Sequence, residues 1–297
     1  MKTKLLACAL AMGAALPAMA ATRSVPSQYS TIQAAVNAAA SGDTISIANG
    51  TYNEQVTIAS SKTHLTFIGA SQTGVILQAG SGATALTIHG TDITFEYMTI
   101  ANTLLSGSTA SHAVYVDSAR VEFYRCYING WQDTFAIWNN ALVYCTFSEV
   151  RGEEDFIYSG GTAYFYNTNI RELNTTGGDC TAPSTPSTVT YGFVFANCSI
   201  IRSSNVGSST TGLMRPWGAN GETAYINCSM DSHIKAAGWD PWGGREATCR
   251  AAEYGSKTLA GATINLATRS SWVVRLTAAQ AATYSKANVL GGWNPPL

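Results

Sequence analysis

Two aspartates stand in stretches where a carboxylate is costly to bury. Asp133 lies in Trp131–Phe135 and Asp155 in Glu154–Tyr158, both rich in aromatic residues. Taken singly, each suits an ordinary turn residue that accepts hydrogen bonds from backbone N–H groups. If the two face each other, their pKa values must separate, so that one is ionised while the other keeps its proton. A nucleophile beside a general acid is what ester or glycoside cleavage requires.

An arginine and three tryptophans stand further along the chain in apolar surroundings. Arg215 follows Met214 and precedes a Pro-Trp pair. A lone arginine is usually a solvated surface charge, but these neighbours predict partial burial beside a carboxylate, and Asp155 is the candidate partner. Trp217, Trp239 and Trp242 either pack in the core or form an aromatic platform for sugar rings.

A short hydrophobic pattern recurs along the chain and predicts how these residues are positioned. Each copy opens with a large apolar residue, and four copies have Cys at the fourth position. The copies are Phe95–Ile100, Phe123–Ile128, Leu142–Phe147, Phe165–Ile170, Phe195–Ile200 and Tyr225–Met230. Uneven spacing between short strands is typical of coils joined by loops of different length. We therefore predict an all-β fold, a right-handed parallel β-helix, with Asp133 and Asp155 on adjacent coils.

Other elements of the coil follow from local patterns. Apolar residues at helical spacing predict a short N-terminal helix over Ser27–Ser41. Thr277 with Gln280 forms a capping-box pattern, which predicts a short C-terminal helix ending near Ser285. One of these helices is expected to cover an open end of the coil. The early strands are predicted at Thr44–Ala48, Gln55–Ile58, Leu65–Ile68, Val75–Gln78 and Leu86–Ile88.

The repeat also predicts what stacks inside the coil and where the long loops emerge. Cys126, Cys145, Cys198 and Cys228 should form one inward row of small buried side chains. The Asn at the third position of the last copies is expected to form a polar row. A Cys180–Cys198 disulfide is left open. The longest excursions are predicted at Leu173–Tyr191 and Ser203–Arg215, where binding residues tend to concentrate.

The first twenty residues have the pattern of a secretion signal. Lys2 and Lys4 precede the apolar run Leu5–Met19, which ends in a small-x-small cleavage site at Ala18–Ala20. We expect a signal peptide at residues 1–20, a single domain at residues 21–297, and a secreted, extracellular or periplasmic monomer. Loss of the two lysines changes the formal charge from −1 to −3. Without basic blocks, nucleic acid and membrane-surface partners are not expected.

Several short motifs together resemble those of the pectin methylesterases (pectinesterases), carbohydrate esterases that remove methyl groups from pectin. The resemblance runs from about Pro26 to Pro296. Trp131–Phe135 resembles the family's YQDTL, Asp155–Tyr158 its DFIF, Leu213–Trp217 its LGRPW, Gly50–Glu54 its GxYxE, Gly238–Trp242 its GWxxW and Leu290–Pro295 its C-terminal ending. Each motif is short, but their shared order makes the signal specific. The family fold is also a right-handed parallel β-helix.

The resemblance implies hydrolysis of methyl esters of pectin, a methylated homogalacturonan, to pectate and methanol. Asp155 would attack the ester carbonyl and form an acyl-enzyme, while Asp133 would act first as acid and then as base. Gln132 would donate a hydrogen bond to the oxyanion, Arg215 would keep Asp155 ionised, and Trp217 would line the sugar site. The resemblance implies neither a metal nor another cofactor. We also expect substrate contacts from Phe156, Tyr158, Thr181, Trp239 and Trp242.

One position departs from the family pattern. The family carries QAVAL before its QDT motif, and its Gln supplies a second oxyanion donor, whereas this chain has His112–Val116. Loss of such a donor typically costs about 10²–10³ in rate. We expect His112 either to replace the donor, adding a pH dependence near neutrality, or merely to fill space. Met214 replaces a family Gly and is expected to narrow the cleft.

Three alternative functions use a similar fold or polymer. A polygalacturonase would carry an adjacent Asp-Asp pair, which this sequence lacks. A pectate lyase would need a cluster of acidic Ca²⁺ ligands, and no such cluster is visible in the sequence. A degenerate relative that binds pectin, or that hydrolyses a different ester, stays open because of His112. Gln132, Asp133, Asp155 and Arg215 favour the esterase, because a binding module has no need of two acids and an arginine in apolar surroundings.

Overall fold

The structure is a computed structural model that describes residues 19–80, 82–104, 111–138 and 140–297. The predicted signal peptide lies outside these residues except for its last two positions. Within the described part, no helix has both the length and the apolar character needed to cross a membrane.

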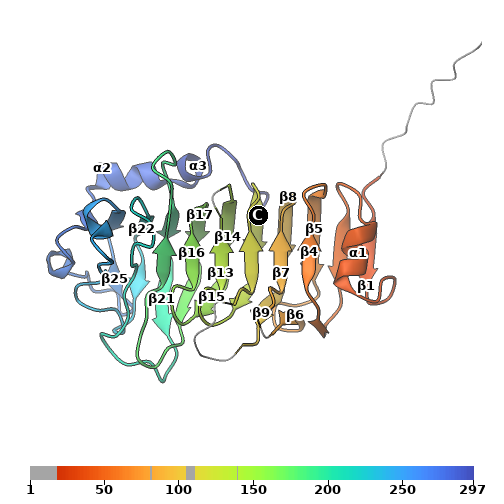
Figure 1. Ribbon diagram of the computed structural model, residues 1–297, viewed down its shortest axis with the longest axis horizontal. Helices are drawn as coiled ribbons and strands as arrows, with labels where there is room; N and C mark the ends of the chain where they lie inside the picture. Colours follow the sequence, from red (N-terminus) through yellow and green to blue (C-terminus); the bar gives the residue numbers. More distant parts are fainter. Residues whose placement is uncertain (1–18, 81, 105–110, 139) are drawn as a thin grey trace, which may run out of the picture.

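The chain winds as a right-handed parallel β-helix whose coils build three parallel sheets, which we name A, B and C (Figure 1). Sheet A contains β1 (Thr22–Val25), β2 (Thr44–Ile47), β5 (Thr63–Gly69), β8 (Thr91–Glu96), β11 (Val121–Tyr124), β14 (Leu142–Thr146), β17 (Thr162–Tyr166), β20 (Phe193–Ala196), β22 (Glu222–Ile226), β24 (Arg250–Tyr254) and β26 (Val274–Arg275). Sheet B contains β3 (Gly50–Asn53), β6 (Val75–Ala79), β9 (Thr99–Asn102), β12 (Tyr127–Asn129), β15 (Glu149–Gly152), β18 (Asn169–Glu172), β21 (Ser199–Arg202), β23 (Ser229–Met230) and β25 (Lys257–Thr258). Sheet C contains β4 (Val56–Ile58), β7 (Leu86–Ile88), β10 (Val114–Val116), β13 (Phe135–Ile137), β16 (Ile157–Ser159) and β19 (Thr181–Pro183). The predicted fold class is confirmed.

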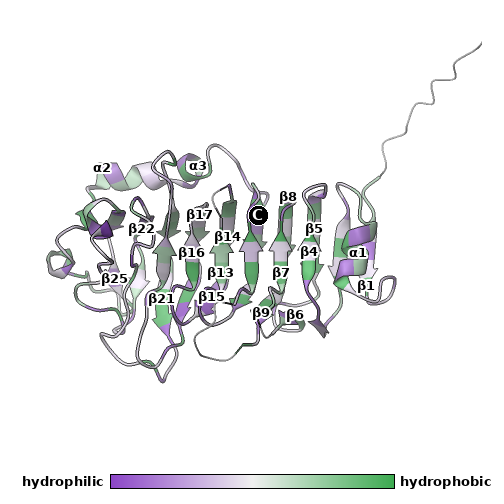
Figure 2. Cartoon of the chain, viewed as in Figure 1, coloured by the Kyte–Doolittle hydropathy of each residue, from purple (hydrophilic) through white to green (hydrophobic). Residues whose placement is uncertain are grey.

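Alternating burial explains why these short segments form strands. Hydrophobic and hydrophilic residues alternate along the strands of the coil (Figure 2), because successive side chains of a strand point to opposite faces. In β5, Leu65 and Phe67 point inward and are buried. The ring of Phe67 stacks on Phe95 at 4.6 Å, and that of Phe95 stacks on Phe123 at 5.2 Å. The aromatic residues that open the repeats therefore form two inner stacks, Phe67–Phe95–Phe123 and Phe165–Phe195–Tyr225.

The fourth copy of the repeat is displaced from its predicted position. Cys145 pairs with Phe123 and with Phe165, so this copy begins at Cys145 and not at Leu142. Cys145 therefore belongs to the inner aromatic row, and the position beside Cys126 is held by Ser148, whose hydroxyl accepts a hydrogen bond from the Cys126 N–H at 2.9 Å. The prediction that Cys145 shares a row with the other cysteines is wrong, because Leu142–Cys145 resembles the start of the repeat three residues before the aligned position.

The cysteines of the described residues are all free thiols. Cys180 and Cys198 are both buried, and the disulfide left open between them is not formed. Burial raises the pKa of Cys180 and of Cys198 well above the ordinary thiol value. These side chains thus behave as small buried hydrophobes of the coil.

The two predicted helical regions cover different parts of the coil. The N-terminal helix is shorter than predicted, α1 (Ile32–Ala38), and Thr31 caps it by accepting from the Ala34 N–H at 3.1 Å. It packs at the N-terminal end of the coil (Figure 1). The capping box of Thr277 and Gln280 is confirmed at the start of α2 (Ala278–Ala281). That region continues as η3 (Ala282–Tyr284) and α3 (Lys286–Val289), and the other short helical turns are η1 (Arg245–Ala247) and η2 (Leu266–Thr268).

The C-terminal helices do not cover an end of the coil. Ala281 and Val289 pack against the outward side chains of sheet A, among them Tyr144 and Tyr164, and α2 and α3 lie along one side of the coil in Figure 1. The predicted early strands are present as β2, β4, β5, β6 and β7. The long loop predicted at Leu173–Tyr191 contains β19, which brings part of it back into sheet C.

Candidate active site

Asp133 and Asp155 occupy the same position on adjacent coils. Each lies two residues before a strand of sheet C, and the register pairs Phe135 of β13 with Ile157 of β16. The Asp133 N–H donates to the backbone oxygen of Glu154 at 3.2 Å. The prediction that the two aspartates lie on adjacent coils is therefore confirmed.

Both aspartates have left-handed backbone conformations. Their φ angles are 57° for Asp133 and 51° for Asp155. Asp tolerates this region better than most residues because its short polar side chain bonds locally, yet the conformation still costs free energy relative to extended backbone. Two such residues side by side turn the chain sharply from sheet B toward sheet C. The turn presents both carboxyl groups to one cleft.

Arg215 reaches these carboxylates from the loop that follows β21. Its Nε donates to Asp155 Oδ1 at 2.9 Å and to Oδ2 at 3.1 Å, and its Nη2 donates to the same carboxylate. The pair is therefore bidentate, the geometry that a guanidinium fork suits best. Asp155 is 5% exposed. Arg215 thus supplies the positive charge that a buried carboxylate requires.

Two elements hold the Arg215 guanidinium in place. The Arg215 backbone N–H donates to the Thr181 carbonyl at 3.0 Å, which ties the loop to β19. The guanidinium lies over the Trp242 ring, 4.3 Å from its centroid, a favourable cation–π geometry. The backbone of Arg215 is thus held by β19, and its guanidinium is held by the face of Trp242.

The electrostatics separate the two aspartates. Burial and the charge of Asp155 raise the pKa of Asp133 to about 7, against the opposing charge of Arg215. Burial also raises the pKa of Asp155 above its ordinary value, but the hydrogen bonds and charge of Arg215 oppose that rise. Asp133 is therefore the carboxyl group that keeps a proton near neutral pH, and Asp155 is the one that a guanidinium holds as an anion.

Two further acidic residues surround the guanidinium. Arg215 Nη2 lies 2.6 Å from Glu154 Oε1, and its Nε lies 3.9 Å from Asp179 Oδ2. Asp179 is 4% exposed, and its Oδ1 has no partner among the described residues. Burial and the charges of Asp240 and Asp155 raise the pKa of Asp179 well above its ordinary value, which favours the protonated form of this side chain beside the pair. The sequence patterns did not identify Asp179, because it lies in a loop outside the repeat.

A narrow cleft opens at this point on the outer side of sheet C. Its volume is about 200 Å³. Trp217, 38% exposed, stands at its rim with its ring 5.8 Å from that of Tyr158. The lining residues are Gln132, Asp133, Asp155, Tyr158, Ala182, Arg215, Trp217 and Trp242. Two carboxyl groups, an amide donor, a guanidinium and aromatic walls are thus brought together, a set suited to nucleophilic attack on an ester.

Comparison with known proteins decides the family. The pectinesterase family model matches residues 19–293. The chain is 31% identical to pectinesterase A of Dickeya dadantii, with 91% of this chain and 88% of that protein covered. The chain belongs to the pectinesterase family. As a pectinesterase, it is a carboxylic ester hydrolase.

Solved members of the pectinesterase family share the fold. The pectin methylesterase from Erwinia chrysanthemi superposes with a TM-score of 0.77 at 26% identity, covering 95% of this chain and 100% of that one. A pectin methylesterase in complex with a hexasaccharide gives the same TM-score at 27% identity and the same coverage. The carrot enzyme gives 0.82 at 22% identity over 94% of this chain and 95% of that one, a likeness of fold alone.

Some residues expected to touch substrate are enclosed in the pectinesterase fold. Phe156 and Thr181 are 0% exposed and Trp239 is 1% exposed. The Trp239 Nε1 donates to buried Glu253 at 3.2 Å, so this ring packs in the core, as the alternative for the tryptophans had it. The prediction that Phe156, Thr181 and Trp239 contact the substrate is wrong, because these three side chains point into the coil. Met214 is likewise fully buried and does not narrow the cleft.

His112 lies beside the cleft and not in its lining. Its Nε2 is 2.6 Å from the Tyr158 hydroxyl, and its Nδ1 is 3.3 Å from Thr84 Oγ1. The imidazole also stacks on the Tyr158 ring, with the ring centroids 5.7 Å apart. Burial lowers the pKa of His112, so the ring is neutral at neutral pH. The expected pH dependence near neutrality therefore moves to more acidic pH, and any effect of His112 on the cleft passes through Tyr158.

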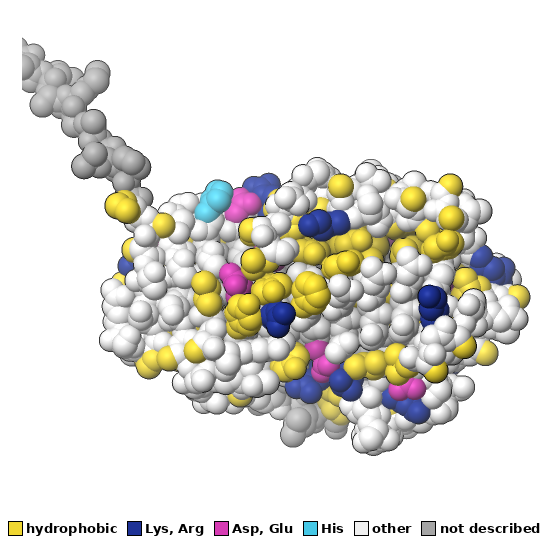
Figure 3. Space-filling model, turned by 180° about the vertical axis from the view of Figure 1, so that it is seen from behind, with side chains coloured by type: hydrophobic (Ala, Val, Ile, Leu, Met, Phe, Trp, Pro, Cys, Tyr) yellow, Lys and Arg dark blue, Asp and Glu magenta, His cyan; other side chains and the backbone are white. Residues whose placement is uncertain are grey.

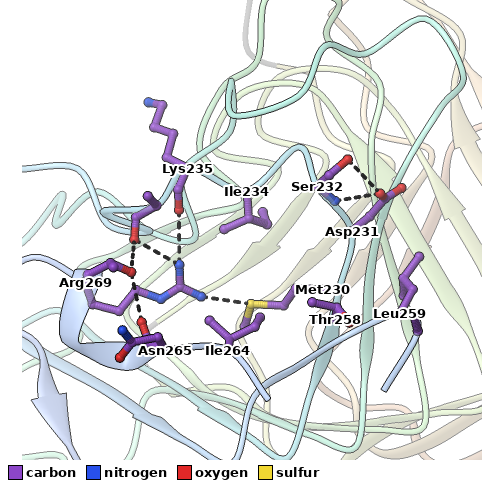
Figure 4. Close-up of a pocket in the computed structure, with 13 residues that line it drawn as sticks. Met230, Asp231, Ser232, Ile234, Lys235, Thr258, Leu259, Ile264, Asn265 and Arg269 are labelled. Atoms are coloured by element: carbon purple, nitrogen blue, oxygen red, sulfur yellow. Dashed lines mark hydrogen bonds between the residues drawn. The ribbon is translucent and has the colours of Figure 1, made fainter. Parts of the chain in front are cut away.

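A larger cavity, about 410 Å³, lies near the C-terminal end of the coil (Figure 4). Met230, Ile264 and Leu259 give it apolar walls. Arg269 closes its base, donating to Met230 Sδ at 3.4 Å while Glu253 pairs with it at 2.9 Å. The residues that line this cavity include a single carboxylate, Asp231, so the cavity lacks the pair of acids that the chemistry requires. Its larger volume therefore does not identify it as the active site. We assign the chemistry to the smaller cleft at Asp133 and Asp155.

Arg215→Met should destabilise the protein by on the order of 3 kcal/mol near pH 7, because the variant leaves a buried carboxylate without its partner. Burial raises the pKa of Asp155 in the folded state, so the variant's deficit is greatest above that pKa and shrinks as falling pH protonates Asp155. Denaturant unfolding at about pH 7 and about pH 4 measures both. As a control, Arg120→Met breaks the more exposed bidentate pair with Asp92 and should cost at most about 1 kcal/mol. Equal losses in the two variants would contradict the prediction.

Proposed function

We propose that this pectinesterase hydrolyses the methyl esters of pectin, a methylated homogalacturonan, to give pectate and methanol. The observation that carries the proposal is the pair of carboxyl groups at one position of adjacent coils. Asp155 is held as an anion by Arg215, and Asp133 has a pKa of about 7. A nucleophile and a proton donor are therefore present together in a cleft that also has aromatic walls.

The first half of the proposed reaction forms an acyl-enzyme. The Asp155 carboxylate attacks the carbonyl carbon of the ester, and the carbonyl oxygen takes the negative charge. The side-chain amide of Gln132, which lines the cleft, donates a hydrogen bond to that oxygen. Protonated Asp133 gives its proton to the departing methoxy oxygen, so that the C–O bond breaks and methanol leaves. An anhydride between the substrate and Asp155 remains.

The second half returns the enzyme to its starting state. Asp133 is now ionised and takes a proton from a water molecule, whose oxygen attacks the anhydride carbonyl carbon. The bond to Asp155 breaks, leaving a galacturonate carboxylic acid and an Asp155 carboxylate paired with Arg215. Asp133 is protonated again by the water proton. One carboxyl group thus serves as acid and then as base, which suits a pKa near neutrality.

The cleft also supports a sugar polymer as substrate. Trp217, Tyr158 and Trp242 present aromatic faces around the carboxyl pair. The C–H face of a sugar ring packs well on such surfaces while its hydroxyl groups stay in water. A solved relative carries a hexasaccharide. We therefore keep Trp217, Tyr158 and Trp242 as substrate contacts, and we propose that the mature domain works as a secreted monomer.

Methanol release from highly methylated pectin tests the proposal. The purified protein should release methanol and leave polymer chains of unchanged length. Absence of methanol, under conditions where a known pectin methylesterase is active, would refute the function. Shortened or unsaturated chains would instead indicate a glycosidase or a lyase.

The second candidate is a relative that binds pectin or cleaves a different ester. One observation favours it, namely that His112 stands where the family has the Gln of its second oxyanion donor. Comparison of pectin with small acetyl and methyl esters separates the two functions. Faster hydrolysis of a small acetyl ester than of methylated pectin would favour the second candidate.

Variants of His112 show how that residue contributes. Because His112 bonds Tyr158, we expect His112→Ala to lower kcat by about tenfold, the effect of losing one buried hydrogen bond. His112→Gln should recover most of that loss, because an amide can also bond the Tyr158 hydroxyl. Stopped assays of methanol give kcat and KM for each variant. A fall in kcat of about 10²–10³-fold in His112→Ala would instead make His112 itself an oxyanion donor.

A further inference from the structure

From β8 to β24, each coil turns from sheet A to sheet B through one residue whose backbone is left-handed. The N–H of each corner residue bonds to the carbonyl of the residue before the next corner, for example Tyr97 to Tyr124 at 3.2 Å and Phe147 to Tyr166 at 3.2 Å. The corner residues therefore stack along the axis of the coil. We name them the corner row: Tyr97, Arg125, Phe147, Asn167, Asn197 and Asn227, with φ angles of 54°, 50°, 49°, 47°, 54° and 54°.

The residue types in the corner row change part-way along the coil. Left-handed backbone favours Gly and Asn, and it is unfavourable for bulky side chains. The later coils follow this rule with three asparagines and then Gly255, whose φ is 65°. Tyr97, Arg125 and Phe147 do not follow it. Their large side chains are thus present at a conformational cost that the turn itself does not explain.

The aromatic side chains along the corner row form a partly exposed line, in which Tyr97, Tyr124 and Tyr166 are half-buried. Tyr97 contacts Tyr124 edge-on at 5.6 Å, Tyr124 contacts Phe147 at 6.1 Å, and Phe147 contacts Tyr166 at 6.4 Å. Phe147 is 50% exposed. Seen from behind, the molecule shows hydrophobic side chains gathered beside a basic one near the middle of that face (Figure 3). A contiguous apolar patch that reaches solvent indicates an interaction site.

Arg125 adds a positive charge to this line. Its guanidinium lies 5.5 Å from the Tyr124 ring centroid and 6.0 Å from that of Phe147, and its Nε donates to the Tyr124 hydroxyl at 3.1 Å. The side chain is exposed, and no carboxylate of the described residues forms an ion pair with it. Stacking between two rings orients the guanidinium, and its remaining N–H groups are available to an anion.

We propose that the corner row with Tyr124 and Tyr166 is a second, non-catalytic binding site for an acidic polysaccharide. Sugar rings would pack their C–H faces on the aromatic line, and a uronate carboxylate would pair with Arg125. The row is linear, and it repeats at the strand spacing of about 4.8 Å, which suits an extended chain. The exposed amides of Asn167, Asn197 and Asn227 continue the line with hydrogen-bonding groups.

The location of the corner row separates it from the cleft. The row joins sheets A and B, whereas the cleft opens on sheet C, so the two sites face different sides of the coil. A polymer held at the corner row can keep the enzyme on the cell-wall matrix while the cleft stays free. The choice of a uronate polymer rests on the proposed function.

The test replaces two residues by the residue that the later coils use. In Arg125→Asn/Phe147→Asn the turn keeps a side chain suited to left-handed backbone, so the fold should be retained, as thermal unfolding will verify. Co-sedimentation with insoluble, unmethylated pectate measures binding. We expect the apparent affinity for pectate to fall at least about tenfold, because the variant loses an aromatic contact and a cation. The kcat and KM on short methylated oligogalacturonides should stay unchanged.

Three outcomes would overturn the proposal. Equal retention of wild type and double variant on pectate would show that the corner row does not bind the polymer. Equal affinity of the wild type for a neutral polysaccharide would refute the role of Arg125. Unchanged pectate binding together with loss of a dimer in sedimentation would show that the row contacts a second copy of the chain. Since unmethylated pectate offers no ester, these results are independent of whether the cleft releases methanol.

Discussion

Asp155→Asn should lower methanol release from pectin by at least about 10⁴-fold, as expected when a covalent nucleophile is removed. The amide is a poor nucleophile, yet it is nearly the same size, and it can still accept a hydrogen bond from Arg215. Arg215 keeps a carboxylate partner in Glu154, 2.6 Å from its Nη2, so the neutral amide does not leave the guanidinium without a counter-charge. The variant should therefore fold normally while its chemistry is lost.

The measurement compares this variant with Asp92→Asn. Asp92 also forms a bidentate pair with an arginine, Arg120, but on sheet A. Asp92→Asn should keep the wild-type kcat, so a loss confined to Asp155→Asn reports the chemistry of the cleft. If the wild type is quenched during turnover and digested, an increase in the mass of the peptide that contains Asp155 would identify the acyl-enzyme directly. Activity of Asp155→Asn near the wild-type level would refute the assignment of the nucleophile.

The sequence predicted the carboxyl pair because the repeat fixes its register. Asp133 lies ten residues after Phe123, and Asp155 lies ten residues after Cys145, the residue that β14 aligns with Phe123. Starting that copy at Leu142 hid this equality but still placed the aspartates on adjacent coils. A repeated strand carries its following turn with it, so the turn residues stack even when the strand register is misjudged.

The surroundings of the pair were not predictable in the same way. Asp179 lies in a long loop and reaches Arg215 only because it bridges to Gly212 in the next long loop. A Cβ on Gly212 would come within 2.1 Å of Asp179 Oδ1, so this approach depends on tertiary packing and on a residue without a side chain. No periodic pattern reports such a contact between loops.

Burial of the aromatic residues was also beyond the sequence. Phe156 follows Asp155 directly, and the left-handed turn at Asp155 sends its side chain into the coil. Trp239 bonds Glu253 of β24, which is distant in sequence from the cleft. The GWxxW motif alone does not indicate that Trp239 is buried in the core while Trp242 contacts Arg215. The direction of each side chain depends on backbone turns that single motifs do not encode.

Asp133→Asn should lower kcat/KM by about 10²–10⁴-fold, because it removes the proton donor for the leaving methanol. The wild type needs Asp133 protonated, and burial raises the pKa of Asp133 to about 7. The rate should therefore fall as pH rises through about 7 and should level off as pH falls below it. The acidic limb of the pH profile reports Asp155, because the nucleophile must be ionised. Since the pKa of Asp155 is raised, the acidic limb should lie at higher pH than the ordinary pKa of an aspartate.

The pH profile of kcat/KM distinguishes Asp133 from other acids that titrate near neutrality. The charge of Glu154 raises the pKa of Asp133, so Glu154→Gln should move the alkaline limb to lower pH. Glu172 has a pKa of about 8 and is fully buried outside the cleft, so Glu172→Gln should leave the limb in place. An alkaline limb that persists in the residual activity of Asp133→Asn, or that moves in Glu172→Gln, would assign the titration to a different group. The charge of Glu154 also raises the pKa of Asp179 and of Glu172, so a shift in Glu154→Gln alone does not identify the group. An alkaline limb that moves in Glu154→Gln, stays in place in Glu172→Gln and is absent from the residual activity of Asp133→Asn would assign the proton for methanol to Asp133.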